Sequence, residues 1–272
     1  MRVGFIGLGS QGGPMARRIV AAGYPTTLWA RRPASLEPFA DTAASTADSP
    51  ADLAAASDLV CVCVVGDADV REVVLGERGV LAGLAPGSIL AIHATVHPAT
   101  CRELADIAAA QQVSVIDAPV SGGGPAAEAG TLLVMVGGAI EAVERARPVF
   151  ATYADPVVHL GEVGAGQTTK LLNNLLFTAN LATSASTLAL GSDLGISPDR
   201  LGEVISHGTA NSFALGRLVA GDGTLTRLAA HAGDLLRKDV GLVADLATSA
   251  GITPGVVLGT ADATLGMMGR SR

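Results

Sequence analysis

The residues best suited to chemistry lie between positions 161 and 174. A glycine-rich stretch, Gly161 to Gly166, leads into a segment of helical composition that carries Lys170, Asn173 and Asn174. Lys170 and Asn174 are four residues apart, so a helix places both on one face, where they can reach the same ligand. A lysine near a helix start is usually a solvated charge. Here 22 uncharged residues follow it, which favours a buried amine that can exchange a proton.

A second polar segment, Asp117-Ala118-Pro119-Val120-Ser121-Gly122-Gly123, follows a predicted strand. A serine beside two glycines offers a hydroxyl and unobstructed backbone N–H groups, which together suit a carboxylate. Taken alone, such a segment is more often an ordinary loop. Its reading as a binding site therefore depends on what surrounds it.

A phosphate-binding turn is predicted near the N-terminus. Gly7-Leu8-Gly9-Ser10-Gln11-Gly12 matches G-x-G-x-x-G directly after a predicted strand and before a predicted helix, which is the context that the pattern requires. The first glycine permits the turn, the second lets a pyrophosphate approach the backbone, and the third allows helix and strand to pack closely. The alternative is a purely structural glycine turn.

The end of the second predicted strand bears on the choice of dinucleotide. An NAD site usually has a carboxylate there, about 20 residues beyond the glycines, to bind the ribose hydroxyls. This chain has Arg31 and Arg32 instead, and no carboxylate. Two guanidiniums suit a ribose 2′-phosphate, so we expect NADP rather than NAD. The alternative is that both arginines are solvated surface residues.

The chain divides into two regions with different predicted secondary structure. Short apolar runs alternate with helical segments up to about residue 160, which predicts a doubly wound, mostly parallel sheet. After Gly166 no strand is predicted, and helices are expected near 167–194, 198–206, 212–220, 233–250 and 255–268. We therefore expect a dinucleotide-binding domain over 1–163 and an all-helical domain for substrate binding and dimerisation over 164–272.

Composition excludes several classes of protein. The 272 residues are 49% hydrophobic and 16% charged, which is typical of folded domains rather than disorder. The net charge of −7, with no basic run longer than two arginines, argues against nucleic acid as the partner. Leu171 to Ser192 is uncharged, but its asparagines would be costly in lipid, so we expect no membrane span.

The cysteines and histidines suggest no further site. Three cysteines are an odd number, and Cys61 and Cys63 lie within an apolar run, so reduced thiols and a cytoplasmic location are expected. The first residues also lack the pattern of an export signal. His93 and His97 are four apart, but they flank Thr95 at a strand end with Pro98 following, so we expect no metal site.

Four motifs, in order, resemble those of the β-hydroxyacid dehydrogenase family, which includes 3-hydroxyisobutyrate dehydrogenases and glyoxylate/succinic semialdehyde and tartronate semialdehyde reductases. They are the glycine turn within residues 4–16, the segment 117–138, the pattern Gly164-x-Gly166-x-x-x-Lys170-x-x-Asn173-Asn174, and Lys238-Asp239. The resemblance spans nearly the whole chain. It implies a Rossmann domain joined through a long helix to a helical domain, forming homodimers or homotetramers.

The resemblance also implies a role for individual residues. Lys170 would be the catalytic acid/base, and a small carboxylate-bearing substrate would be held by Ser121, Gly122, Gly123 and Asn174. Lys238 would lie near both nicotinamide and substrate. The cofactor would contact Gly7, Leu8, Gly9, Gln11, Gly12, Arg31, Arg32, Val64, Val65 and Thr95.

Two other functions remain open. Imine reductases share this scaffold, but their relatives typically have another proton donor where this chain has Lys170. A non-catalytic cofactor-binding protein is the second alternative, and the presence of Lys170, Ser121 and Asn174 together argues against it.

Overall fold

The computed structural model describes residues 1–221 and 224–272, and it divides into two compact units, Met1–Lys170 and Leu171–Arg272. The division falls inside a long helix, α8 (Ala165–Asp193), whereas the expected boundary at 163/164 lies just before that helix begins.

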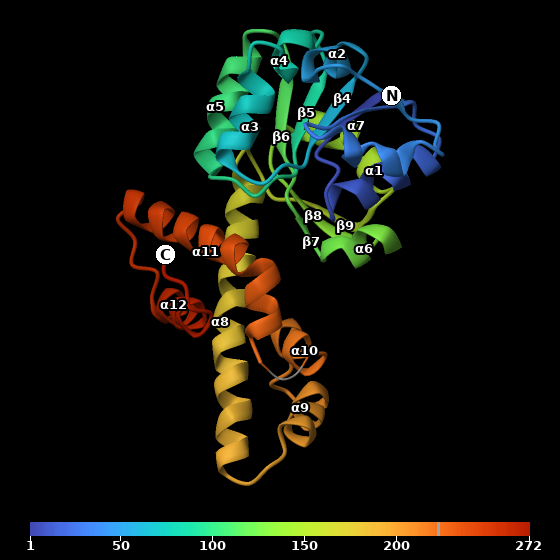
Figure 1. Ribbon diagram of the computed structural model, residues 1–272. Coiled ribbons are helices and arrows are strands. Elements are labelled where there is room, and N and C mark those ends of the chain that lie inside the picture. Colours follow the sequence, from blue (N-terminus) through green and yellow to red (C-terminus); the bar gives the residue numbers. More distant parts are fainter. Residues whose placement is uncertain (222–223) are drawn as a thin grey trace. The chain divides into compact units, whose positions relative to one another are not determined.

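The first unit is built on a parallel sheet of six strands in the order β3-β2-β1-β4-β5-β6 (Figure 1). The chain order reverses between β1 and β4, as in doubly wound folds that bind ligands at the carboxyl ends of the strands. The strands are β1 (Val3–Ile6), β2 (Thr26–Trp29), β3 (Ser45–Thr46), β4 (Leu59–Val62), β5 (Ile89–Ile92) and β6 (Ser114–Asp117). β1, β4 and β5 are buried throughout, as expected for strands covered on both faces.

Helices cover both faces of this sheet. Val60 and Val62 point to one face, where they pack with α2 to α5, while Cys61 points to the other, where it packs with α1 and α7. Ser49 caps α2, because its hydroxyl accepts a hydrogen bond from the Asp52 N–H at the start of that helix. The helices are α1 (Gly12–Ala21), α2 (Pro50–Ala55), α3 (Asp67–Leu75), α4 (Val80–Gly83), α5 (Pro98–Ala109), α6 (Gly123–Ala129) and α7 (Ile140–Phe150), with short 3-10 turns at Pro33–Ser35 and Glu37–Phe39.

A second, smaller sheet in the first unit has β8 (Leu132–Val136) as its central strand. β8 lies between β7 (Val120–Ser121) and β9 (Ala154–His159), and it is antiparallel to β7. A single bridge between Asp117 and Gly137 links the two sheets. The sequence did not predict β7, because only two residues of the Asp117 to Gly123 segment are extended.

The second unit contains only helices within its described residues. They are the remainder of α8, then α9 (Pro198–His207), α10 (Phe213–Val219), α11 (Thr226–Ser249) and α12 (Val256–Met267), and they enclose a core of their own. α11 begins seven residues before the predicted start at 233, and Leu228 and Ala229 from this extra stretch pack against the core. No helix of the described chain is long and apolar enough to cross a membrane.

Candidate active site and cofactor groove

The glycine turn has the geometry predicted for phosphate binding. Gly7 has φ +98°, and a Cβ atom there would overlap the Cys63 carbonyl oxygen, while a Cβ at Gly12 would overlap the Gly7 carbonyl oxygen. Gly9, by contrast, would meet nothing within 4 Å. The outer glycines are therefore needed for packing, and the middle one leaves open space against the backbone, where a pyrophosphate can approach.

A groove of about 440 Å³ opens at this turn, at the carboxyl ends of β1, β2 and β4. It brings together three segments that are distant in sequence: the glycine turn, the residues after β2 and the residues after β4. Of the predicted cofactor residues, those lining the groove are Gly7, Leu8, Gly9, Arg31, Arg32, Val64 and Val65. Gln11 and Gly12 instead form the start of α1.

Arg31 and Arg32 both line the groove, but their surroundings differ. The Arg31 guanidinium lies 3.5 Å from Asp69 Oδ1 and 3.7 Å from Glu72 Oε2, both on α3. Arg32 forms no ion pair within residues 1–221 and 224–272. Ser35 also lines the groove. The unpaired guanidinium and this hydroxyl could both contact a phosphate.

The loop that carries Thr95 is fixed by a residue that sequence reasoning missed. Gln167 is fully buried; its Oε1 accepts a hydrogen bond from the Val96 N–H at 3.1 Å, and its Nε2 donates one to the Ala94 carbonyl at 2.7 Å. Both neighbours of Thr95 are therefore attached to the first turn of α8. The one signal in the sequence is an amide side chain three residues before Lys170.

The start of α8 is held in turn by Asp117. Its buried carboxylate accepts hydrogen bonds from the backbone N–H groups of Gly164 (2.6 Å) and Gln167 (2.7 Å). Burial raises the pKa of Asp117, and these two N–H groups act against that rise. Glycine is required nearby, because a Cβ atom at Gly166 would lie 2.9 Å from Asp117 Oδ2. The sequence showed Asp117 at the strand end but not this capping role.

Lys170 lies one turn after Gln167 on this anchored helix, and only 8% of it is exposed. Ser121 is half-buried at the end of β7, and Gly122 and Gly123 are exposed with φ of +129° and +73°. These positive φ angles favour glycine at both positions. The backbone beside Ser121 is therefore open to solvent, as a carboxylate cradle requires.

In the second unit, Asp239 connects two of the predicted substrate residues. Its Oδ2 accepts a hydrogen bond from Asn174 Nδ2 at 2.6 Å, and its Oδ1 lies 3.0 Å from the ammonium of Lys238. Asp239 is buried, and among the described residues the Lys238 ammonium is the one charged partner of Oδ1. Asn174 and Lys238, 64 positions apart, thus share one carboxylate, and the orientation of the Asn174 amide is fixed by it.

The histidines near the strand ends have structural partners. His93 is buried, with Nδ1 2.6 Å from the Ala118 carbonyl and Nε2 3.2 Å from the Tyr153 hydroxyl. Burial lowers the pKa of His93 to about 4, so its ring is neutral near pH 7. His97 accepts a hydrogen bond at the start of α5. In the part of the chain that is described, no group of three or more His, Cys, Asp or Glu residues could hold a metal ion.

Two family models match consecutive parts of the chain. Residues 2–161 match the NAD-binding domain of 6-phosphogluconate dehydrogenase, and residues 164–268 match the NAD-binding domain of NADP-dependent 3-hydroxyisobutyrate dehydrogenase. Together they cover both units.

Individual proteins agree with this match. A 3-hydroxyisobutyrate dehydrogenase of Pseudomonas aeruginosa is 34% identical over 88% of this chain and 83% of its own. The structure of a Mycobacterium tuberculosis 3-hydroxyisobutyrate dehydrogenase with L-serine superposes with a TM-score of 0.85 at 28% identity, covering 96% of this chain and 92% of that one. A Streptomyces aurantiacus imine reductase has the same fold, with a TM-score of 0.70 at 20% identity over 97% and 93% of the two chains.

The open glycine turn, the groove at the reversal of strand order and the buried lysine on an anchored helix thus occur in a chain that both family models cover. The protein belongs to the β-hydroxyacid dehydrogenase family of NAD(P)-dependent oxidoreductases.

Proposed function

We propose that this protein is an NADP(H)-dependent dehydrogenase that interconverts a small β-hydroxy acid with its semialdehyde, or with a 2-oxo acid, and that Lys170 is its general acid/base. The observation that carries the proposal is the burial of Lys170 on a helix whose first turn is tied to the Thr95 loop by Gln167. An amine held in this way can act repeatedly at one position.

Lys170 acts on the oxygen of the reacting carbonyl. In reduction, its ammonium donates a hydrogen bond to that oxygen, stabilises the negative charge that develops there, and then transfers a proton. In oxidation, the neutral amine accepts the proton of the alcohol. The nicotinamide, when bound, supplies or accepts the hydride.

The carboxylate of the substrate is held by Ser121, the backbone of Gly122 and Gly123, and the amide of Asn174. Asp239 accepts a hydrogen bond from the Asn174 amide and forms an ion pair with Lys238. The side chains of Asn174 and Lys238 are therefore preorganised within their unit. The relatives are named for hydroxy acids such as 3-hydroxyisobutyrate, which combine a carboxylate and an alcohol in a small molecule. A substrate of that class suits the proposed cradle.

For the cofactor, we propose NADP rather than NAD. The groove has no carboxylate on the loop directly after β2 to bind the ribose hydroxyls, and Arg32 and Ser35 line it. Asp69 and Glu72 form ion pairs with Arg31 and offset its charge, so Arg32 provides most of the attraction for a 2′-phosphate. The second family model is also named for an NADP-dependent enzyme.

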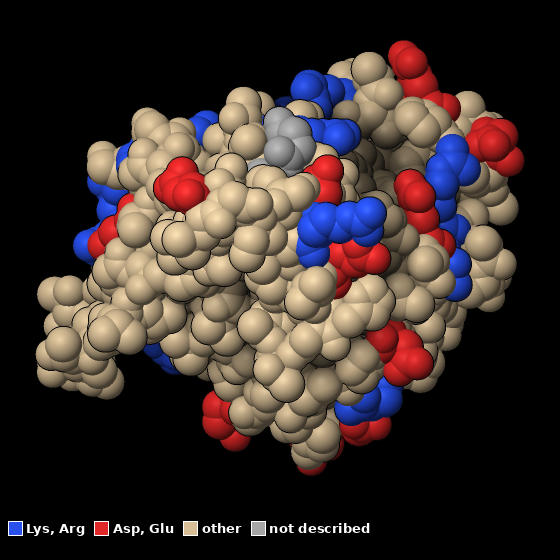
Figure 2. Space-filling view, turned by 90° about the horizontal axis from the view of Figure 1, so that it is seen from below, with Lys and Arg blue, Asp and Glu red and all other residues tan. Residues whose placement is uncertain are grey.

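We infer that the protein is a homodimer or homotetramer in the cytoplasm. Large apolar side chains are exposed along α8, including Leu172 and Leu176 at 55% each and Leu190 at 58%, and exposed apolar surface of this kind is typical of interfaces. All three cysteines are free thiols. On the face drawn in Figure 2, blue and red side chains occur in small mixed groups, which gives no continuous basic surface for nucleic acid.

A screen of NADPH oxidation tests the proposal. The purified protein is assayed with glyoxylate, succinic semialdehyde, tartronate semialdehyde and methylmalonate semialdehyde, and with a cyclic imine for comparison, each also with NADH. We expect turnover with at least one of the carboxylate-bearing aldehydes and higher kcat/KM with NADPH. Turnover of the imine alone would identify an imine reductase, and no turnover of any compound would favour a non-catalytic role.

A further inference from the structure

The substrate cradle, Ser121–Gly123, leads directly into the short helix α6. This helix has seven residues, Gly123–Ala129, and its first three are glycine, glycine and proline, the two residue types with the lowest helix propensity. A helix of this length is barely stable on its own hydrogen bonds. The position and direction of α6, and with them those of the cradle, therefore depend on contacts with neighbouring elements.

The first turn of α6 lies against the glycine turn that precedes α1. A Cβ atom at Gly124 would lie 2.8 Å from the carbonyl oxygen of Ser10, and Ser10 is part of the G-x-G-x-x-G pattern. Further along α6, Ala127 is buried in the same apolar core as Met15 of α1. The segment proposed to bind the pyrophosphate and the segment proposed to bind the substrate are therefore in close contact within the first unit.

Arg18, on α1, binds the other end of α6. Its Nη1 donates a hydrogen bond to the Glu128 carbonyl at 2.9 Å, and its Nε donates to the carbonyl of Thr152, just after α7. The last carbonyls of a helix have no partner within that helix, and a basic side chain near them both donates to them and suits the negative end of the helix dipole. The guanidinium of Arg18 thus caps α6 and connects it to α1.

Gly130 leaves the space that this guanidinium occupies. It follows α6 with φ +76°, and a Cβ atom there would lie 2.5 Å from Nη2 of Arg18. The two contacts of α6 with α1 and the turn before it are thus at opposite ends of the helix, about 10 Å apart for seven residues at about 1.5 Å each. Because two separated contacts fix both the position and the direction of α6, loss of either one lets the cradle move.

We propose that Arg18 is a positioning residue for substrate binding, an inference that rests on the proposed function of the cradle. Arg18 holds the carbonyl end of α6 on α1, while the other end lies against the glycine turn. The carboxylate of the substrate is thereby bound at a fixed place relative to the phosphates of the cofactor. This placement keeps the reacting carbon within reach of the nicotinamide, where small displacements strongly reduce the rate. Arg18 acts through α6 and not by contact with the substrate.

Amide hydrogen exchange of the full-length protein tests whether Arg18 holds α6. In R18Q, the amides of residues 124–130 should exchange at least about tenfold faster, because the loss of one charge-assisted hydrogen bond has an effect of that order on local opening. R17Q is the matched control. Arg17 is the preceding residue of α1, but its guanidinium donates to the Pro38 carbonyl and lies 3.6 Å from Asp41, so exchange in α6 should stay as in the wild type. Unchanged exchange in R18Q would overturn the proposal.

Steady-state kinetics test the effect on the substrate. With a carboxylate-bearing aldehyde that the wild type reduces, R18Q should raise KM about tenfold and leave the Kd of NADPH unchanged, whereas R17Q should change neither. A merely structural role would lower the Tm and leave KM unchanged at temperatures far below the unfolding transition. If R18Q does not fold, Gly124→Ala replaces it, because its Cβ atom would push the opposite end of α6 away from Ser10. That variant should raise KM likewise, and an unchanged KM would overturn the proposal.

A variant of the cradle itself, S121A, separates this inference from the proposed function. A rise in KM in S121A without a rise in R18Q would overturn the role of Arg18 and leave the proposed function intact. No rise in either variant would refute the cradle, and the inference with it. If no compound is turned over, the proposed function fails together with the role of Arg18 in substrate binding, whereas hydrogen exchange still decides whether Arg18 holds α6.

Discussion

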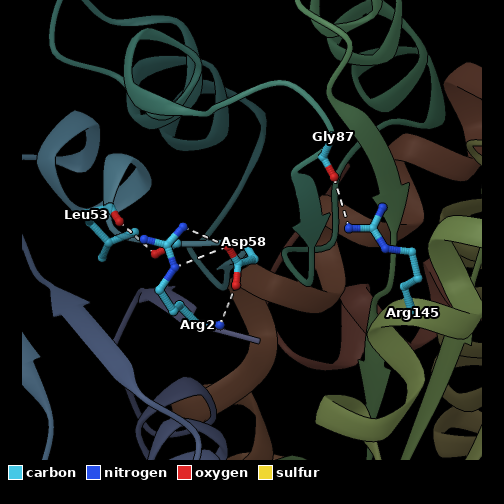
Figure 3. Close-up of polar contacts among 6 residues, drawn as sticks. Arg2, Leu53, Asp58, Gly87 and Arg145 are labelled. Carbon is cyan, nitrogen blue, oxygen red and sulfur yellow. Dashed lines mark hydrogen bonds and ion pairs between the residues drawn. The ribbon is translucent and has the colours of Figure 1, made fainter.

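The two edges of the six-stranded sheet use their polar groups differently. At the amino ends of the strands, these groups bind one another: Arg2 donates to Asp58 through its backbone N–H and its guanidinium at 2.7 to 3.2 Å, and Arg145 donates to the Gly87 carbonyl at 3.0 Å (Figure 3). The Ser57 hydroxyl likewise donates to the Leu53 carbonyl. The polar groups named at this edge therefore form their hydrogen bonds with other groups of the protein.

At the carboxyl ends, the same sheet opens into the cofactor groove. Gly9 would meet nothing within 4 Å if it carried a Cβ, and Arg32 has no acidic partner among the described residues. The polar groups that are bonded there, Asp117 and Gln167, hold the segments that carry Thr95 and Lys170. Substitutions at this edge should therefore change activity, while those at the amino edge should affect stability alone.

The largest effect is expected for Lys170→Ala. Removing the amine leaves no positioned group to exchange a proton with the carbonyl oxygen, so kcat should fall at least about 100-fold. NADPH binding should persist, because the groove lies elsewhere in the first unit. Steady-state kinetics and a cofactor titration measure the two quantities. Turnover near that of the wild type would remove Lys170 from its proposed role.

Gln167→Met comes next. It keeps the length of the side chain but loses both hydrogen bonds to the Thr95 loop, leaving the Val96 N–H and the Ala94 carbonyl unpaired. We expect stability to fall by about 1–3 kcal/mol and kcat/KM to fall more than stability alone explains. Thermal unfolding and kinetics below the transition are compared with Thr168→Ala, an exposed residue whose hydroxyl donates to the Gly164 carbonyl just before α8 and not to the Thr95 loop. Equal activity in both variants would contradict the positioning role.

The sequence predicted the features that depend on local pattern. The glycine turn, the short apolar strands and the helix carrying Lys170 each follow from residues within one short segment. It did not predict the contacts of Gln167, because its partners Ala94 and Val96 are more than 70 positions away. The bridge that Asp239 forms between Asn174 and Lys238 was missed for the same reason.

Two errors concern weak local signals. β7 is only two residues long and depends on pairing with β8, so its own sequence resembles a loop. The first turns of α11 contain threonine and alanine with few large apolar residues, and their helical state is favoured by the packing of Leu228 and Ala229. In both cases tertiary contacts, not local preference, determine the structure.

A smaller, selective effect is expected at the arginines of the groove. Arg32→Gln should weaken NADP⁺ binding about tenfold, since it removes a charge-assisted hydrogen bond to the 2′-phosphate, and should leave NAD⁺ binding unchanged. Arg31→Gln should weaken NADP⁺ binding less, because Asp69 and Glu72 already offset that charge. Trp29, the single tryptophan, lines the groove and reports binding by fluorescence. An equal loss for both cofactors would reject a 2′-phosphate site.

The smallest effect is expected at the amino edge, with Asp58→Asn. Hydrogen bonds from Arg2 lower the pKa of Asp58 below its ordinary value. A lowered pKa in the folded state means that the ion pair contributes fully above the unfolded pKa of about 4, and that this contribution is lost as the pH falls through the folded pKa. Both side chains are substantially exposed, so solvent screening keeps the contribution small.

Thermal unfolding of Asp58→Asn and the wild type as a function of pH tests this expectation. The two proteins should differ slightly near pH 7, and the difference should shrink below about pH 4 and vanish once the pH has fallen through the lowered pKa of Asp58 in the folded wild type. Values of kcat and KM for both cofactors should be unchanged, because the pair lies at the opposite edge of the sheet from the groove. A loss of activity that exceeds the loss of stability would show that the two edges are coupled, and the functional distinction between them would then fail.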